Sequence, residues 1–286
     1  MQYYLCILIA IVIWSLNSGI FVRYIAIPGL AFASIGGFFA FIATTIFVLP
    51  HLKNNLTSIV KDSKLHRTFI LIAILHAVNI GLYTMALKSG LIANAVMGHY
   101  IQPLVVGLIF APIILRDKIT PRTIFCALLG LAGLLIMMWP KNNSFVLDSA
   151  LVLGLLSGVF FAWHIVLEKD ISRTALHPLI PAWYKTSFLA LLFSPFAFQY
   201  LLATPSMKDI GLLAVVGILV LCLSLWFFQI GLKKVETSHA SFMTYLEPVL
   251  SILFAFLFFS EPIDIQTIIG GMCILCGGII LSVKRG

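Results

Sequence analysis

The chain has 286 residues, of which 61% are hydrophobic and only 10% are charged, and its mean hydropathy is +1.11. Soluble domains carry about 25% charged residues, so this composition excludes an ordinary soluble enzyme or binding domain and indicates a membrane protein. The formal net charge of +8 would fit a nucleic-acid partner only if the basic residues formed a common surface, and their positions in the chain argue against that.

Ten apolar stretches follow one another along the chain, each close to the length of about 18–22 residues that crosses a bilayer core as a helix. The links between them are short, apart from one between Pro50 and Arg67. The opening stretch lacks the basic start and cleavage site of a signal peptide, so we expect it to be the first membrane helix. The sequence therefore predicts an all-α polytopic membrane protein with ten transmembrane helices, at residues 2–22, 29–49, 68–87, 91–115, 122–139, 147–167, 181–203, 209–231, 238–259 and 265–283.

Basic residues are distributed very unevenly between the two sides of this arrangement. Four lie in loops on one side: Arg23, Lys88, Lys141 and Lys208. All the others lie on the side of the N-terminus, if Lys185 at the end of the seventh helix is counted with them. Because positive loops stay in the cytoplasm, we expect both termini to be cytoplasmic and the protein to lie in a bacterial inner membrane. The excess of basic residues is then explained by the topology and by contact with anionic lipid head groups, and no nucleic acid is expected as a partner.

Two hexapeptides in the apolar stretches are alike, YIQPLV at residues 100–105 and YLEPVL at residues 245–250. The match extends well beyond them, since residues 86–114 align with residues 231–259 without a gap. After a one-residue shift it continues through the following stretch. The sequence therefore contains an internal repeat.

Each copy of this repeat holds five predicted helices, so the second copy must cross the membrane in the opposite sense to the first. The loop charges agree, because the loop after the fourth helix is basic whereas its counterpart carries Glu261 and Asp264 and no base. We predict that residues 1–145 form the first repeat and residues 146–286 the second, inverted repeat of one transport domain. Inverted repeats around a site near the middle of the bilayer are typical of secondary transporters.

Glu247 is the one acidic residue that the predicted ranges place near the middle of a helix, because the other carboxylates, Glu168 among them, fall at helix ends or in loops. A charge at this depth costs about 2.5–3.5 kcal/mol of insertion free energy. We expect Glu247 to face a wet interior, as a contact for a substrate amine or as a proton carrier; a protonated side chain that only bonds a neighbouring helix is the alternative. Thr244 shares its face, and in the first repeat this face carries Gln102 and His99.

The tyrosine and the proline of each motif have separate expected roles. At ~100° per residue, each tyrosine lies about 200° around the helix from Gln102 or Glu247, so we expect the rings to pack or to gate and not to share the polar face. Pro103 and Pro248 cannot donate to the carbonyl four residues back. We therefore predict a kink or hinge at each proline, with the freed carbonyl either packed away or lining a cavity.

Other polar and aromatic residues within the predicted helices are candidates for a cavity lining: Asn17, Asn79, Tyr83, His164, Trp14 and Trp163. Asn79 and Tyr83 share a helical face at i and i+4, and we expect Trp163 to face the cavity and stack on a substrate, with packing or a lipid-facing position as the alternative. For each polar candidate the alternative is a purely structural role, in which the side chain forms a helix–helix hydrogen bond worth under ~1 kcal/mol. We find no nucleotide-binding, catalytic or metal-binding pattern, so we expect no metal, no cofactor and no enzyme.

The segments LEPVLSILFAFLFFSEPIDIQTIIGG and IQPLVVGLIFAPIILRDKITPRTIFC, together with WSLNSGIF near the N-terminus, resemble the motifs of the drug/metabolite transporter superfamily, in its EamA-type branch. Cys126 stands where a glycine is usual, and Ser15 replaces the glycine of the family's Trp-Gly-x-Asn opening. The resemblance covers nearly the whole chain. It implies ten helices in two repeats, both termini in the cytoplasm, and export of amino acids or related small metabolites.

The sequence thus favours a gradient-driven exporter of amino acids or similar small metabolites that works by alternating access, as a monomer or weak oligomer in a lipid bilayer. An importer or exchanger of a nucleoside-like metabolite such as S-adenosylmethionine is the alternative. An intramembrane enzyme or a lipid-handling protein is a remote alternative, because it would need a paired acid and base or a metal cluster that the sequence does not show.

Overall fold

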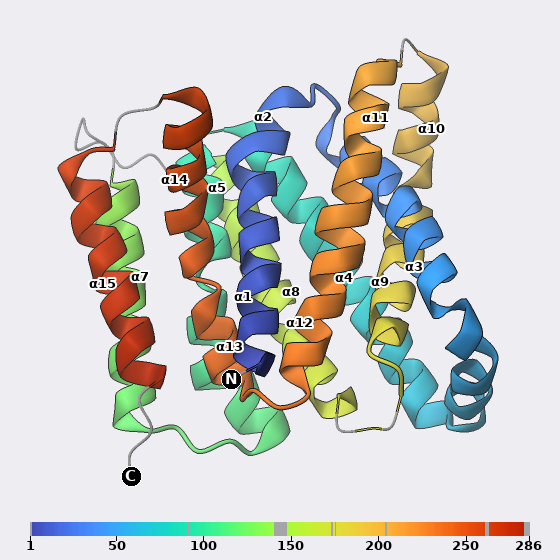
Figure 1. Cartoon of the computed structure of the whole chain (residues 1–286), viewed down its shortest axis with the longest axis horizontal. Coiled ribbons are helices and arrows are strands. Elements are labelled where there is room, and N and C mark those ends of the chain that lie inside the picture. The colour runs from blue at the N-terminus through green and yellow to red at the C-terminus, as the bar shows by residue number, and fades with distance from the viewer. Residues whose placement is uncertain are drawn as a thin grey trace.

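The computed structural model describes residues 2–90, 92–139, 148–172, 174, 176–203, 205–260 and 263–282. Every regular element in this part of the chain is helical, and the helices stand side by side in one bundle (Figure 1). The elements are α1 (Gln2–Leu16), η1 (Asn17–Phe21), α2 (Val22–Tyr24), α3 (Gly29–Lys61), α4 (Ser63–Ser89), α5 (Ile92–His99), α6 (Gln102–Val105), η2 (Val106–Leu115), α7 (Pro121–Met138), α8 (Ser149–Ile171), α9 (Leu179–Leu192), α10 (Ser194–Leu202), α11 (Met207–Val216), η3 (Gly217–Leu223), α12 (Ser224–Leu232), α13 (Thr237–Met243), α14 (Leu246–Phe259) and α15 (Ile265–Ser282).

The predicted class, an all-α polytopic membrane protein, is confirmed. Seven helices in the described chain are long and apolar enough to cross a bilayer, and three further apolar helices, Gln2–Leu16, Leu179–Leu192 and Ile265–Ile280, are shorter. One of the short ones is α9, which ends just before Pro195, as a helix commonly does ahead of a proline. The number of ten crossings therefore stays a prediction.

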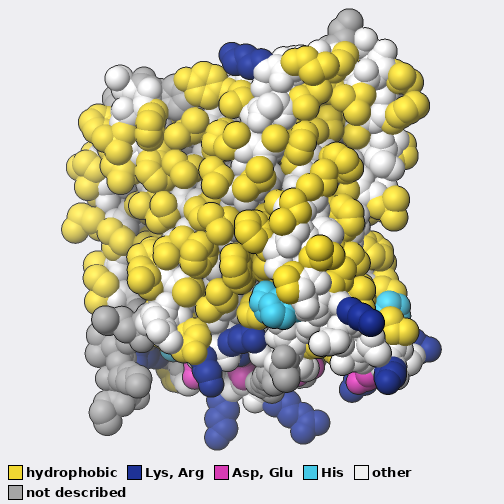
Figure 2. All heavy atoms as spheres, turned by 45° about the vertical axis from the view of Figure 1, so that its right-hand side comes forward, with side chains coloured by type: hydrophobic (Ala, Val, Ile, Leu, Met, Phe, Trp, Pro, Cys, Tyr) yellow, Lys and Arg dark blue, Asp and Glu magenta, His cyan; other side chains and the backbone are white. Residues whose placement is uncertain are grey.

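The surface carries the pattern of a membrane protein. Hydrophobic side chains cover most of the face in Figure 2, and Lys and Arg side chains gather mainly along its lower edge. The chain begins at this edge and α15 ends there (Figure 1). This distribution accords with the predicted charge bias, while the assignment of that edge to the cytoplasm stays a prediction.

One predicted loop is helical. The link expected between Pro50 and Arg67 is built almost wholly from α3, which continues through Pro50 to Lys61, and from α4, which begins at Ser63. The turn between them is stabilised by Asp62, whose carboxylate accepts hydrogen bonds from the backbone N–H groups of Lys64 and Leu65, both at 3.0 Å. This N-cap satisfies the free donors at the start of α4, so the helical hairpin closes within a single residue.

Both motif copies interrupt their helix just before the proline. The first interruption separates α5 from α6 and the second separates α13 from α14, so that Pro103 and Pro248 lie in the first turn of a new helix. A proline is well tolerated there because N–H groups of the first turn have no partner within the helix. The carbonyl of Thr244 accepts instead from the N–H of Glu247, at 2.9 Å, so it is not left unpaired.

The two copies also end alike, and their one-residue shift has a structural cause. Arg116 and Ser260, which close the two helices, are the non-glycine residues of the described chain with a left-handed backbone, with φ of 59° and 55°. Between the motif and this end, the first copy is a π-helix, η2, whereas the second remains α-helical through α14. A π-helical turn holds more residues than an α-helical one, so η2 accommodates the additional residue.

Small residues bring α5 and α8 unusually close. A Cβ atom added at Gly158 would lie 2.5 Å from the carbonyl oxygen of His99, and one at Gly154 would collide with the carbonyl oxygen of Ala95. These glycines, one turn apart on α8, form a flat strip on which the α5 backbone rests. The strip therefore fixes the position of the helix that ends at His99.

We expect Gly158→Ala to destabilise the protein, because the new methyl group cannot fit without moving α5, and overpacking of this kind costs about 1–3 kcal/mol. Gly211→Ala is the matched control, since a Cβ at this helical glycine meets nothing within 4 Å, and alanine is favoured over glycine in helices by about 0.5–1 kcal/mol. Thermal unfolding in detergent should show a lower melting temperature for the first variant and an unchanged or higher one for the second. Equal melting temperatures for the two variants would contradict the close contact between α5 and α8.

Candidate functional site

A cavity of about 90 Å³, room for several water molecules, lies inside the bundle and is lined by side chains from both halves of the chain. Helices α1, α3, α4, α8, α9 and α12 contribute to it, as do the two interrupted segments around the motifs. Eight of the nine residues that the sequence suggests for a cavity lining are on its wall: Trp14, Asn17, Asn79, Tyr83, His99, Gln102, His164 and Glu247.

Trp163 is the exception, and its predicted place in the cavity is wrong. Its ring stacks on Phe110, with centroids 6.0 Å apart and planes at 26°, and 36% of the residue is exposed. The next residue, His164, occupies the inward position on α8 instead. Adjacent residues on a helix point about 100° apart, and with His164 directed inward the ring of Trp163 lies at the outer surface beside Phe110.

Glu247 has no charged partner in the described part of the chain, whose ion pairs lie elsewhere. The residue is 8% exposed, and its Oε1 atom accepts a hydrogen bond of 2.9 Å from the hydroxyl of Ser18, in η1. A buried carboxylate without a cation is unfavourable unless something neutralises it. A proton or the positive group of a bound molecule would do so.

Gln102, the neutral counterpart of Glu247, joins the two motif copies. Its amide nitrogen donates to the hydroxyl of Thr244, and its amide oxygen accepts from the hydroxyl of Ser241 at 2.7 Å. All three residues are buried. The amide therefore has both a donor and an acceptor bond across the boundary between the two copies, which accounts for a neutral side chain at this position.

Tyr100 corrects the expectation that the motif tyrosines avoid the polar face. It lines the cavity together with Gln102, because the helix is interrupted between them and the count of ~100° per residue no longer applies. Tyr245 behaves as expected: it is fully buried and packs edge-to-face on Phe242, with centroids 5.2 Å apart.

His99 and Asn79 are held by one shared partner. The hydroxyl of Ser157 donates to Asn79 Oδ1 at 3.1 Å and lies 2.6 Å from His99 Nδ1. The imidazole of His99 also stacks on Tyr83, with centroids 4.1 Å apart. These contacts leave the amide nitrogen of Asn79 without a partner in the described chain, as a donor available to the cavity.

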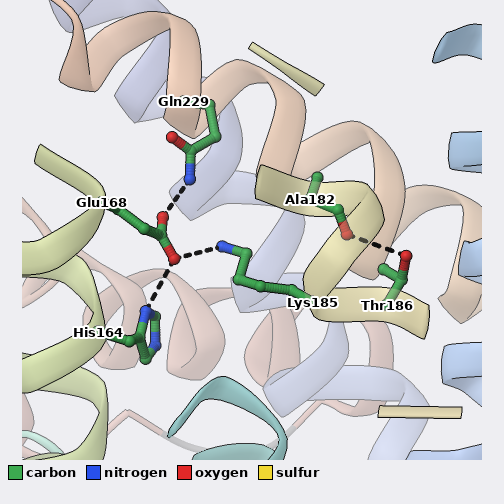
Figure 3. A network of polar contacts seen from close by, with 6 residues as sticks. All are labelled: His164, Glu168, Ala182, Lys185, Thr186 and Gln229. Carbon is green, nitrogen blue, oxygen red and sulfur yellow. Dashed lines mark hydrogen bonds and ion pairs between the residues drawn. The ribbon is translucent and has the colours of Figure 1, made fainter. Parts of the chain in front are cut away.

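A second buried carboxylate lies on the cavity wall, and the sequence interpretation missed it. Glu168 is within α8 with its side chain fully buried, and Lys185, expected among the cytoplasmic charges, forms an ion pair with it at 2.8 Å. The same carboxylate interacts with His164 Nδ1 at 2.9 Å and accepts a hydrogen bond from the amide of Gln229 (Figure 3). The i, i+4 spacing of His164 and Glu168, which places both side chains on one face of the helix, is the sequence signal that could have revealed this cluster.

Comparisons with known proteins give the family. The model of the EamA-like transporter family matches residues 1–139 and 148–283. The chain belongs to this family. The predicted resemblance is thereby confirmed, and the polytopic helical fold is that of a membrane transporter.

Several relatives of this EamA-family protein are transporters by name. An uncharacterised transporter of Archaeoglobus fulgidus is 24% identical over 91% of this chain and 89% of its own length. The S-adenosylmethionine uptake transporters of Rickettsia prowazekii and Rickettsia felis are 25% and 27% identical, each over 83% of this chain and 79% of theirs. A solved crystal structure with 18% identity superposes with a TM-score of 0.77, covering 98% of this chain and 96% of the other, which shows a shared fold.

Proposed function

We propose that this EamA-family protein is a secondary transporter that moves a small, positively charged metabolite through the cavity around Glu247. The observation that carries the proposal is the buried carboxylate of Glu247, which faces the cavity without a cation. Since Glu168 is already paired with Lys185, Glu247 is the carboxylate of the cavity that can bind a substrate cation. An amine or a sulfonium would satisfy it, and we propose no enzymatic step.

The rest of the wall suits an amphipathic substrate. Aromatic rings from Trp14, Tyr83, Phe161 and Phe228 surround it, and a ring face attracts a cation or stacks on a flat group. The amide of Asn79 supplies a hydrogen-bond donor. Amino acids and amino-acid-like compounds, moved outward, are the leading class.

Uptake or exchange of S-adenosylmethionine is the second candidate, favoured by the names of the two Rickettsia relatives. That molecule carries a sulfonium, an amine and a purine, which match the carboxylate and the rings of the cavity. The sequence shows no nucleotide-binding loop, so either substrate would be driven by a gradient.

We propose alternating access between two inverted repeats as the mechanism. The packing supports it: α4 lies along α8, and α12, the counterpart of α4, lies along α1, the counterpart of α8. The family model matches the chain in two consecutive segments, and the two motif helices end in the same left-handed turn. The predicted boundary between residues 145 and 146 lies outside the described residues. We further propose a bacterial inner membrane with both termini in the cytoplasm.

Counterflow in proteoliposomes tests this function. Vesicles loaded with unlabelled S-adenosylmethionine, lysine, phenylalanine or glutamate would receive a trace of the same labelled compound outside. We expect transient accumulation of a cationic compound and none of glutamate, whose net negative charge would be repelled by Glu247. Accumulation of glutamate alone, or no accumulation of any amine or sulfonium in a wider panel, would contradict the proposal.

A further inference from the structure

The neighbours of His164 fix the tautomer of its neutral imidazole ring. The Glu168 carboxylate is ion-paired with Lys185 and accepts from Gln229, and an ionised carboxylate can only accept hydrogen bonds. The contact of 2.9 Å between Glu168 Oε1 and His164 Nδ1 therefore requires the hydrogen to be on Nδ1. In the neutral imidazole the other nitrogen, Nε2, then carries a lone pair.

This Nε2 atom is buried on the cavity wall without a partner in the described chain. His164 is 3% exposed, and His76, on α4, lies against it with ring centroids 5.1 Å apart. A buried acceptor without a hydrogen-bond partner is unfavourable, so an arrangement that holds one in place against a cavity points to a ligand. The ligand that an imidazole lone pair binds most readily is a proton.

We propose that His164 Nε2 is a proton-binding site of the cavity, separate from Glu247. The proton comes from the water on whichever side the cavity is open, adds to the Nε2 lone pair, and leaves from the same atom. The charged and titratable groups that face the ring are Glu168 on its own helix, Lys185 on α9, His76 on α4 and His99 on α5. Glu168 orients the ring and stabilises the imidazolium, as a carboxylate does in a His–carboxylate pair.

A consequence for coupling follows from the charges and rests on the proposed function. The ion pair of Glu168 and Lys185 is neutral, so the protonated cavity gains one positive charge at His164 and has one negative charge at Glu247. A substrate cation at Glu247 and a proton at His164 repel each other across a poorly screened interior. Binding of one therefore favours release of the other, which is the condition for exchange of substrate against proton.

The protonation of His164 can be measured without any substrate. Full-length protein with ¹⁵N-labelled histidine, in lipid nanodiscs, would be titrated from pH 8 to pH 4.5 by NMR, with signals assigned from single His→Asn variants. We expect a hydrogen on Nδ1 and none on Nε2 at pH 8, and a second ring hydrogen on Nε2 as the pH falls. Glu168→Gln should lose the preference for the Nδ1–H form, and His76→Asn should keep it. A wild-type ring that carries its hydrogen on Nε2, or that never gains a second one, would overturn the proposal.

A transport measurement separates this site from the proposed function. Proteoliposomes would be given labelled lysine or S-adenosylmethionine as probes, first in counterflow and then against a pH gradient. For each variant, the accumulation driven by the gradient would be divided by its own counterflow rate, and we expect this ratio to fall at least tenfold in His164→Asn. A ratio equal to that of the wild type would overturn the proton site while leaving the transporter function intact. Absence of counterflow for every probe in the wild-type protein would count against the proposed function, and the NMR titration would still decide the site.

Discussion

Replacement of Glu247 by glutamine is expected to lower the transport of a cationic substrate by roughly 100- to 4,000-fold. Glutamine keeps the size of the side chain and can still accept the hydrogen bond from Ser18, so only the charge is removed. Loss of one partner from a buried charge pair costs about 3–5 kcal/mol, and every 1.4 kcal/mol is about a factor of ten. Initial rates of exchange in proteoliposomes, normalised to the amount of folded protein, measure the effect.

The matched control for this change is Glu236→Gln. Glu236 has the same side chain, but it lies just before α13 with its side chain 78% exposed. We expect wild-type transport from this variant. Similar rates for the wild type and both variants would show that the Glu247 charge is not used for binding, and similar losses in both would indicate a general effect of lowered acidity.

The second large effect is expected on stability, from Lys185→Met. Methionine fills much of the space of lysine but leaves the fully buried carboxylate of Glu168 without its cation. Breaking a buried pair in this way costs about 3–5 kcal/mol, enough to lower the melting temperature in detergent by roughly 10 °C. Lys234→Met, the same change at an exposed lysine, should leave the melting temperature near that of the wild type.

The double variant Lys185→Met, Glu168→Gln shows whether the pair itself is responsible. Once the carboxylate is also neutral, no buried charge is left uncompensated, so the double variant should recover most of the stability that the single one loses. A double variant less stable than Lys185→Met alone would mean that the two residues contribute independently, and the cluster of Figure 3 would then not act as a unit.

The fold class could be predicted because it depends on composition and on the length of the apolar stretches, and both are local properties of the chain. Much of the cavity lining could be predicted as well. Glu247 and Gln102 stood out because a repeat marks them as equivalent and because polar residues deep in a membrane helix face the interior. Asn79 and Tyr83 followed from the i, i+4 spacing, and the cavity wall contains all four.

The errors have physical causes that a single sequence does not show. Glu168 was placed near a helix end, but α8 continues to Ile171 and buries it beside a lysine from another helix. Tyr100 was assigned to the wrong face because the helix breaks next to it. Trp163 is predicted to face inward as an aromatic residue within a predicted helix, whereas its direction depends on which face of α8 packs inward.

The central claim is that one cavity around Glu247 opens in turn to the two sides of the membrane, and labelling of Ser18→Cys tests it most directly. The variant would be made in a background without the five native cysteines and treated with a membrane-impermeant thiol reagent from either side. Lys208→Cys, in the first turn of α11, and Glu236→Cys, just before α13, are at exposed positions and report each side separately. We predict that Ser18→Cys reacts from both sides while each control reacts from one. Reaction of Ser18→Cys from a single side under every substrate gradient would contradict alternating access.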